Sequence, residues 1–317
     1  MTPHRSFIIP VVTSEDPAFA AQIAQHRRAL HVHCYRMLAS FSDAEDQVQE
    51  TLLRAWTARA SYDAATGELG LRRWLYRIAT NACLDFLKSA SRKVSNASRS
   101  FSEIPWIEPY PDRLLDDEVA SKQTIALGYL ALIQLLPAQQ RAVYLCRDVL
   151  GWSAGETAEL LEISVAAANS ALQRARQTIA ASASTHPTPT EPTDAERAVL
   201  AAFIDAHQRQ DSAAAFALMR EDIRVTMPPL PAVYVGAESL RPFLVRAFQS
   251  SMGEWRLVPA WANRQPAAVS YLRAPGDTAF RIFKIDVLRV QDGRIAEITT
   301  FDGRGMLDAF GLPEVLS

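Results

Sequence analysis

Cysteine is scarce in this chain of 317 residues, and the three that occur, Cys34, Cys83 and Cys146, lie far apart in amphipathic patterns. That spacing excludes a disulfide framework and indicates buried, reduced thiols. The chain has no apolar run long enough to cross a membrane as a helix, and its stretch MTPHRSFIIPVVTSED lacks the apolar core of a signal peptide. We therefore expect a cytoplasmic protein with no membrane partner.

An excess of charge of either sign is also absent, because the formal net charge is −2. A globally basic protein that coats nucleic acid is thereby excluded, so any contact with nucleic acid must depend on local charge. His31, His33 and Cys34 are metal-ligand residue types, but their spacing gives poor ligand geometry on a helix. We expect no metal and no cofactor. A hydrophobic share of 49% allows two or three domains with sizeable cores.

Residues 136–181 have the pattern of a helix–turn–helix. Pro137 suits the first turn of a helix and Gly151 suits its end. Ser153-Ala154-Gly155-Glu156 is a capping box that opens a short second helix with Ala158 and Leu161 inward. Ser164 is placed to cap a third helix after a tight turn.

The third helix has two distinct faces. Its predicted buried stripe is Ala168, Leu172, Ala175 and Ile179. The opposite face carries side chains suited to base edges and phosphates in a major groove, namely Asn169, Ser170, Gln173, Arg174 and Arg176. The alternative is an ordinary helical hairpin with a solvated polar face.

Residues 71–93, LRRWLYRIATNACLDFLKSASRK, predict a basic amphipathic helix with six basic side chains against one acidic one. Its apolar face is predicted to be Leu71, Leu75, Ile78, Ala82 and Phe86. The polar face, with Trp74 and Tyr76 interleaved, suits phosphate contact and stacking with unpaired bases. Its candidate nucleic-acid residues are Arg77, Asn81, Asp85, Lys88, Arg92 and Lys93. A solvated basic face is the alternative.

Two further helical segments and one acidic segment complete this half of the chain. One amphipathic helix is expected from about Phe19 to Ser40, and a second is expected to open with a capping box from Ser42 to Glu45. This second helix carries an acidic stripe that suits docking of a polar partner, unless it is only a solvated face. Residues 97–120 have three prolines and six acidic residues against two basic ones, which predicts an extended linker with Trp106 and Tyr110 as anchors.

The order of these parts, over roughly Phe19 to Ala181, resembles the extracytoplasmic-function (ECF) subfamily of sigma-70-type RNA polymerase sigma factors. DAEDQVQETLLRAW resembles the region 2 motif that grips the polymerase, RRWLYRIATNACLDFLKSASRK resembles the segment that reads the −10 element, and residues 136–176 resemble the region 4 helix–turn–helix that reads the −35 element. WIEPYPDRLL resembles the linker between them. AAANSALQRAR departs from the commoner Thr-Val pattern of the recognition helix, which leaves the −35 consensus open.

This resemblance implies an all-α region 2 domain at 19–96, the acidic linker at 97–120 and an all-α region 4 domain at 121–183. It implies that core RNA polymerase, through its β′ clamp helices and β flap, and promoter DNA are the partners. The polymerase-binding residues would be Asp43, Glu45, Asp46, Gln49 and Glu50. An anti-sigma factor or a small-molecule ligand is a further possible partner. The alternative function is a one-component, ligand-responsive helix–turn–helix regulator.

Residues 184–193 are rich in Ser, Thr and Pro and predict a second linker, after which the pattern changes to α+β. The segment 194–317 resembles the SnoaL-like family of cone-shaped barrels, with Asp292-Gly293 as a hairpin turn. Candidate ligand-pocket residues are His207, Trp261, Tyr271, Lys284, Asp286 and Asp302. No pair among them has a catalytic spacing, and Lys284 and Asp286 on one strand face could simply neutralise each other. We therefore expect a domain that modulates activity in cis and not an enzyme.

Overall fold

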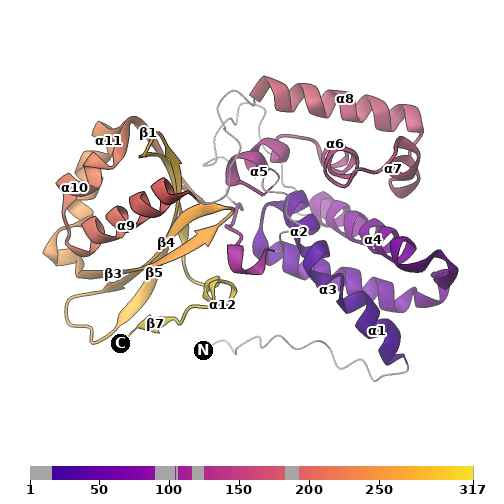
Figure 1. Cartoon of the computed structure of the whole chain (residues 1–317), viewed down its shortest axis with the longest axis horizontal. Helices are drawn as coiled ribbons and strands as arrows, with labels where there is room; N and C mark the ends of the chain where they lie inside the picture. Colours follow the sequence, from indigo (N-terminus) through magenta and orange to yellow (C-terminus); the bar gives the residue numbers. More distant parts are fainter. Residues whose placement is uncertain (1–15, 90–103, 105, 116–124, 183–192, 317) are drawn as a thin grey trace.

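The computed structural model describes residues 16–89, 104, 106–115, 125–182 and 193–316. Within these residues no helix is long and apolar enough to cross a membrane. Two helical domains lie side by side, and a domain built on a β-sheet packs against them (Figure 1). Arg92, Lys93 and nearly all of the predicted 184–193 linker lie outside the described residues.

The first helical domain contains α1 (Pro17–Ala24), α2 (Arg27–Leu38), α3 (Phe41–Thr57) and α4 (Gly67–Ser89). The single helix predicted from Phe19 to Ser40 is therefore wrong, because the chain turns between α1 and α2. The capping box predicted at Ser42 is also wrong. The Ser40 hydroxyl caps α3 by accepting from Asp43 N at 3.2 Å, and Ser42 already lies in the first turn.

The second helical domain contains α5 (Leu127–Gln134), α6 (Ala138–Tyr144) with a π-helical turn (Leu145–Val149), α7 (Ala154–Leu160) and α8 (Val165–Ser182). The capping box from Ser153 to Glu156 is confirmed, as is the cap of α8 by Ser164. Gly151 has a φ of 72°, which ends the helical run as predicted. The predicted stripe of α8 is buried except for Ile179, which is half-buried. In α7 the fully buried leucine is Leu160, and Leu161 is only partly buried.

The third domain begins with α9 (Asp194–Gln208) and α10 (Ser212–Ala217), and α11 (Ala237–Ala247) and α12 (Leu307–Phe310) follow later. Its strands are β1 (Met219–Met227), β2 (Leu230–Val235), β3 (Glu254–Ala262), β4 (Gln265–Arg273), β5 (Phe280–Gln291), β6 (Arg294–Asp302) and β7 (Val315–Leu316). The order is β2-β1-β6-β5-β4-β3, with β1 parallel to β6 and β7 paired to β5. The sheet is open, with β2 and β3 at its edges, so the predicted barrel is not closed. The Asp292-Gly293 turn is confirmed, with both φ angles positive.

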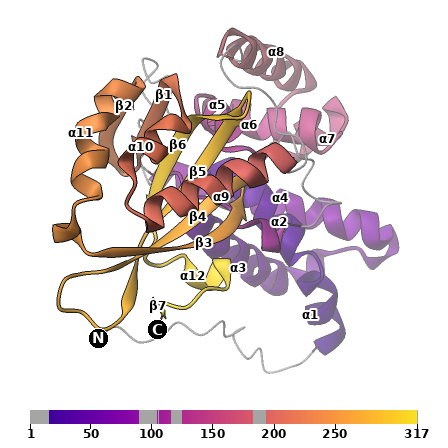
Figure 2. The same ribbon diagram turned by 60° about the vertical axis from the view of Figure 1, so that its left-hand side comes forward.

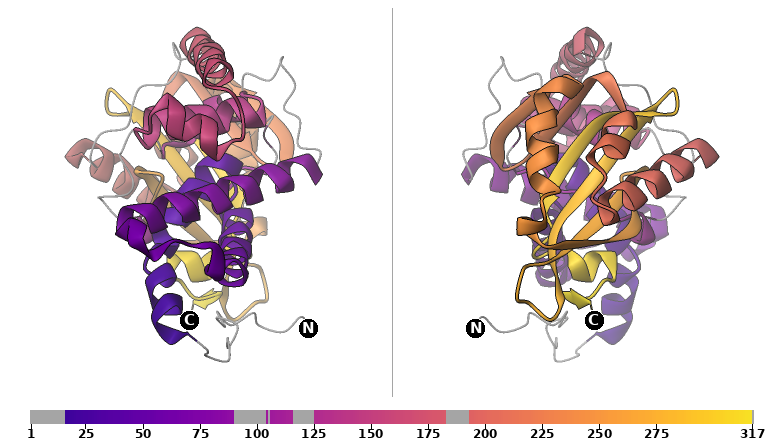
Figure 3. Two further views of the ribbon diagram at one scale, coloured as in Figure 1. Left: turned by 90° about the vertical axis from the view of Figure 1, so that its right-hand side faces the viewer. Right: turned by 90° about the vertical axis from the view of Figure 1, so that its left-hand side faces the viewer.

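The two faces of this sheet belong to different cores. On one face, Ala268 and Leu288 pack with Phe203 of α9 and Leu240 of α11 in a core internal to the domain. Figures 2 and 3 show α9 and α11 lying across this face. On the other face, Val269, Ile285, Val287 and Phe301 join an apolar cluster that also contains residues of α2, α4, α5 and α6. The sheet thus completes the core of the helical domains.

A buried arginine fastens the two helical domains together. Arg141 of α6 donates to the carbonyl oxygens of Ile133, Gln134 and Leu136 in its own domain and to that of Met37 at the end of α2. Burial lowers its pKa to about 9, still above neutral, so the guanidinium stays charged. The Gln134 amide donates to Arg36 O at 3.3 Å beside it. One cation therefore satisfies several helix-end carbonyls that would otherwise be buried without partners.

The described part of the 97–120 linker is extended, with a short 3₁₀ turn at Asp112–Leu114, as predicted. Tyr110 is buried among aromatic rings and confirms its predicted role as an anchor, whereas Trp106 is only partly buried. Asn263 lies in the turn between β3 and β4. Its side-chain oxygen accepts a hydrogen bond from Tyr110 N at 2.8 Å, and its backbone N–H donates to Tyr110 O at 2.9 Å. Its amide nitrogen donates to Tyr35 Oη and Ile125 O. We call this set of contacts the linker junction.

A buried histidine on α2 makes the fold sensitive to acid. His33 Nε2 lies 2.9 Å from Thr80 Oγ1 of α4, and burial lowers the pKa of His33 to about 3, with a smaller contribution from Arg36. Below pH 6.5 the unfolded chain binds a proton at this imidazole that the folded chain excludes until about pH 3. The free energy of unfolding therefore falls as the pH drops through this range.

We predict that His33→Gln flattens this dependence. Glutamine does not titrate, so between pH 6.5 and 4.5 the variant should lose about 2–3 kcal/mol less of its unfolding free energy than the parent. Urea unfolding followed by circular dichroism at several pH values measures the difference. His26→Gln, at a half-exposed site, is the control and should change the slope much less. Equal slopes in parent and His33→Gln would contradict the assignment.

Candidate nucleic-acid interface

The polar face of α4 is basic, as the sequence predicts. Asp85 accepts from Arg54 of α3 at 3.1 Å and lies 3.5 Å from Lys88 Nζ, so its charge is matched locally. Arg77 and Asn81 are half-buried on the same helix, and Lys88 is exposed. Asp85 thus pairs with two cations, and its contact with DNA stays a prediction.

A pocket of about 270 Å³ opens between α3 and α4. It is lined by Arg54, Ala58, Trp74, Arg77, Ile78 and Asn81. An indole wall, an amide and two guanidinium groups offer stacking, hydrogen bonds and positive charge in one place. This combination suits an unstacked base joined to a phosphate.

The exposed face of α8 carries all five residues predicted for it. Within the described part of the chain, the side chains of Asn169, Gln173 and Arg174 make no hydrogen bond, so they are available to a ligand. Arg176 differs, because its guanidinium makes two bonds to the carboxylate of Asp148, at 2.9 and 2.6 Å. Arg176 is therefore fixed against the body of its domain.

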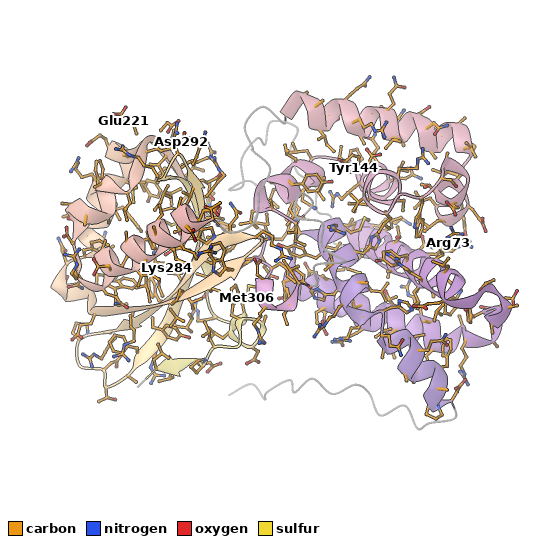
Figure 4. All side chains as sticks on the ribbon, in the orientation of Figure 1. Arg73, Tyr144, Glu221, Lys284, Asp292 and Met306 are labelled. Carbon is orange, nitrogen blue, oxygen red and sulfur yellow. The ribbon has the colours of Figure 1, made fainter. Side chains whose placement is uncertain are left out.

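The helix–turn–helix lies against α4. Arg73 Nη2 lies 2.5 Å from Glu156 Oε1 of α7, and Arg77 Nη2 lies 3.1 Å from Glu162 Oε1 in the turn before α8. Figure 4 shows Arg73 on α4, on the side facing α7. Between them the rings of Tyr76 and Trp152 meet edge to face, with centroids 5.9 Å apart. The two DNA-reading candidates thus touch each other.

The acidic residues of α3 are used unequally. Glu45 pairs with Arg27 and lies 3.6 Å from His31 Nε2, and Gln49 donates to Glu45 at 3.3 Å. Glu50 pairs with Arg54 at 2.7 Å. Asp46 is exposed, on the outer face of the helix. Of the predicted docking residues, Asp46 is the one best placed to meet a partner.

The residues weighed as metal ligands point to different neighbours. His31 Nδ1 lies 3.0 Å from Tyr110 Oη, and His33 bonds Thr80. Cys34 is buried as a free thiol. Among the described residues no cluster of His, Cys, Asp and Glu could hold a metal ion.

Of the candidate pocket residues of the third domain, His207, Lys284 and Asp286 lie near one another and the other three do not join them. Asp286 is fully buried, lies 2.8 Å from Lys284 Nζ and accepts from Thr300 at 2.7 Å, so the two charges on one strand face neutralise each other. His207 is bonded to Phe203 O at 2.8 Å, and burial, with a smaller effect of Lys284, lowers its pKa to about 4.

Three others point elsewhere. Tyr271 donates to Pro313 O on the opposite sheet face, which corrects its placement in a shared pocket. Asp302 pairs with Arg304 at the surface, and Trp261 sits half-buried near the end of β3.

Sequence reasoning missed Asn263, Glu162 and Arg141. Asn263 follows a strand and reads locally as an ordinary turn residue. Glu162 lies in a short turn, and its ion-pair partner, Arg77, is 85 residues away in sequence. Because these roles depend on how domains pack, no local spacing could have identified them.

Comparison with protein families matches the three domains in order. Sigma-70 region 2 matches residues 22–93, Sigma-70 region 4 matches residues 127–179, and a SnoaL-like domain matches residues 200–298.

The chain is also similar to known sigma factors. The chain is 37% identical to the ECF RNA polymerase sigma factor SigG of Mycobacterium tuberculosis, over 94% of this chain and 85% of that protein. It is 31% identical to SigM of the same organism, over 53% of this chain and 79% of SigM. The crystal structure of M. tuberculosis SigJ, an extracytoplasmic function sigma factor, superposes with a TM-score of 0.61 at 21% identity and covers 93% of this chain and 98% of SigJ. That last likeness concerns the fold alone.

Proposed function

We propose a division of labour among the three domains of this chain, which belongs to the ECF subfamily of RNA polymerase sigma factors. As a sigma factor it binds core RNA polymerase, directs promoter-specific initiation and is not an enzyme. Membership over nearly the whole chain argues against the alternative of a one-component regulator. The place of action proposed is the cytoplasm, where the polymerase transcribes. An anti-sigma factor and a small-molecule ligand stay predictions.

The outer face of α3 is the proposed docking site for the β′ clamp helices. Asp46 is exposed there, while Glu45 and Glu50 are already paired within the domain. A partner meeting this face would gain complementarity chiefly from Asp46, with Asp43 and Gln49 beside it.

We predict that Asp46→Arg weakens binding to core polymerase about tenfold or more, because reversal of charge places two like charges in contact. Fluorescence anisotropy of labelled protein titrated with core enzyme measures the dissociation constant. Asp277→Arg, an equal charge change in an exposed loop of the third domain, is the control. If both variants bind core equally well, the docking site lies elsewhere.

Promoter reading is assigned to α4 and α8. On α4, the pocket beside Trp74, Arg77 and Asn81 has the size and chemistry for an unpaired base of the −10 element. On α8, Asn169, Gln173 and Arg174 are exposed near the N-terminal half of the helix, which is the part that reaches base edges in helix–turn–helix proteins. Arg176 is assigned a supporting role because of its pair with Asp148.

We predict that Gln173→Ala combined with Arg174→Ala lowers transcription from a promoter with an intact −35 element. Each lost base contact costs ~1–3 kcal/mol, so a drop of tenfold or more is expected. Arg176→Ala should cost less. In vitro transcription with core enzyme measures the effect, with the −35 element scrambled in a parallel template. An equal loss on the scrambled template would assign these residues to phosphate contact.

The third domain is proposed to restrain the sigma domains through the linker junction, and the side chain of Asn263 is the observation that carries this proposal. It bonds Tyr110 of the linker, Tyr35 of α2 and Ile125 before α5. Arg113 of the linker donates to the carbonyl oxygens of Ala309 and Asp308 at the end of α12. The resemblance implies that this linker threads through the polymerase, so the junction must open first.

We predict that Asn263→Ala raises initiation at least threefold at limiting protein concentration. The substitution leaves Tyr110 N and Ile125 O buried without their partner, which destabilises the closed junction. In vitro transcription with core enzyme measures initiation, and circular dichroism checks folding. Gln291→Ala, in the distant β5–β6 hairpin, is the control. A decrease in initiation by a well-folded Asn263→Ala would reverse the proposed sign.

A further inference from the structure

The contact between the helix–turn–helix and α4 has a definite chemistry. Arg73 and Arg77 lie one helical turn apart on α4, and each meets one carboxylate of the other domain, Glu156 and Glu162 respectively. Glu156 lies in the first turn of α7 and Glu162 lies two residues after its end, so the short helix spans the distance between the arginines. Carboxylates on a pair of neighbouring arginines take the positions that phosphates of a nucleic acid would take.

Local structure holds the Glu156 carboxylate and sets the backbone position of Glu162. Glu156 belongs to the capping box, where Ser153 N donates to its Oε2 at 2.7 Å, and the other oxygen faces Arg73. Glu162 lies in the turn with a φ of 55°, a conformation that directs the chain sharply from α7 into α8. The carboxylates are therefore presented by the same motif that reads DNA.

We propose that Glu156 and Glu162 act as an internal substitute for the DNA backbone, so that region 4 shields the basic face of α4 until the two helical domains separate. This inference rests on the proposed reading of the −10 element by α4. Arg77 is the link, since it lines the pocket and also bonds Glu162. The closed arrangement and binding of DNA at Arg77 exclude each other.

The spacing of the two promoter elements also requires the two helical domains to separate. The −10 and −35 elements lie about 25 base pairs apart, which at ~3.4 Å each is on the order of 80 Å. Here α4 and α7 are in direct contact, so the closed chain cannot read both elements together. Because α6, α7 and α8 share one core, lifting the helix–turn–helix from α4 also strains the Arg141 contact to Met37 O.

The two ion pairs between α4 and the helix–turn–helix are exposed, in contrast to the buried Arg141 contact between the same domains. Exposed ion pairs contribute little each, and salt screens them. Neutralising one carboxylate should therefore shift the balance of closed and open forms by about three- to fivefold. A shift of this size is measurable and leaves the fold intact.

The test compares Glu162→Gln with Glu159→Gln in the full chain. Glu159 is an exposed residue of α7 that makes no ion pair within the described residues, so the two variants change charge equally. Spin labels at Thr57→Cys and Gln177→Cys report the separation of α3 and α8, because the three native cysteines are buried. The second readout is anisotropy of a labelled oligo-dT of about 12 nucleotides, which detects phosphate contact.

In Glu162→Gln we expect a longer label-to-label distance and oligonucleotide binding about three- to fivefold tighter, with a salt dependence steeper by about one phosphate contact. Glu159→Gln should match the parent in both. Unchanged distances and affinity in Glu162→Gln would overturn the proposal. Arg77→Ala assembled with core polymerase tests the premise separately. If it opens the promoter as well as the parent, the reading role of α4 fails, and the shielding fails with it.

Discussion

Tyr110 is the residue on which the arrangement of this protein depends. Its backbone N–H and C=O are both bonded to Asn263, while its ring meets Tyr35 and Phe41 of the first domain edge to face. Nearby, Glu108 of the same segment accepts from Ser42 N at the start of α3 at 2.7 Å. A segment of a few residues is thereby bonded to the first domain through side chains and backbone and to the third domain through its backbone. In sequence the linker connects the two helical domains, and in space it also connects the first helical domain to the third domain.

Buried and exposed charged side chains are paired in different ways in this molecule. Where charges are deeply buried they lie beside compensating groups, as with Arg141 among carbonyl oxygens and Asp286 beside Lys284. Where they are exposed, as on α4 and α7, they form single pairs that solvent and salt weaken. The contact between α4 and α7 therefore uses surface ion pairs, whereas the Arg141 contact and the linker junction use buried polar groups.

Much of this architecture is predictable from local pattern. The helix–turn–helix could be derived from Gly151, the Ser153 capping box and the stripe at Ala168 and Leu172, because each acts within a few residues. The basic face of α4 and four strands between Glu254 and Asp302 follow from periodicity in the same way. The start of α3 was misjudged by two residues, because Ser40 and Ser42 are both cap residue types in sequence. Glu108, which accepts from Ser42 N, is 66 residues away in sequence.

The functional contacts between domains were not predictable. Strand β2 was missed because Leu230–Val235 alternates on an exposed edge, after two prolines that suggest a loop. Asn263 and Glu162 act on partners many residues away, and their roles exist only after the domains pack. The pocket between α3 and α4 combines Trp74 with Arg54, residues whose proximity depends on the turn between the helices.

The sheet face that packs in the same core as the helical domains determines how a shortened chain would behave. Val269, Ile285 and Val287 are fully or almost fully buried in a cluster that contains residues of the helical domains, Tyr35 and Ile125 among them, as well as Leu307 and Phe310 of α12. Cutting the chain before α9 would leave an apolar surface on each fragment that water solvates poorly. Each fragment would then favour self-association, so a truncated protein would differ from the parent in colloidal behaviour as well as in regulation.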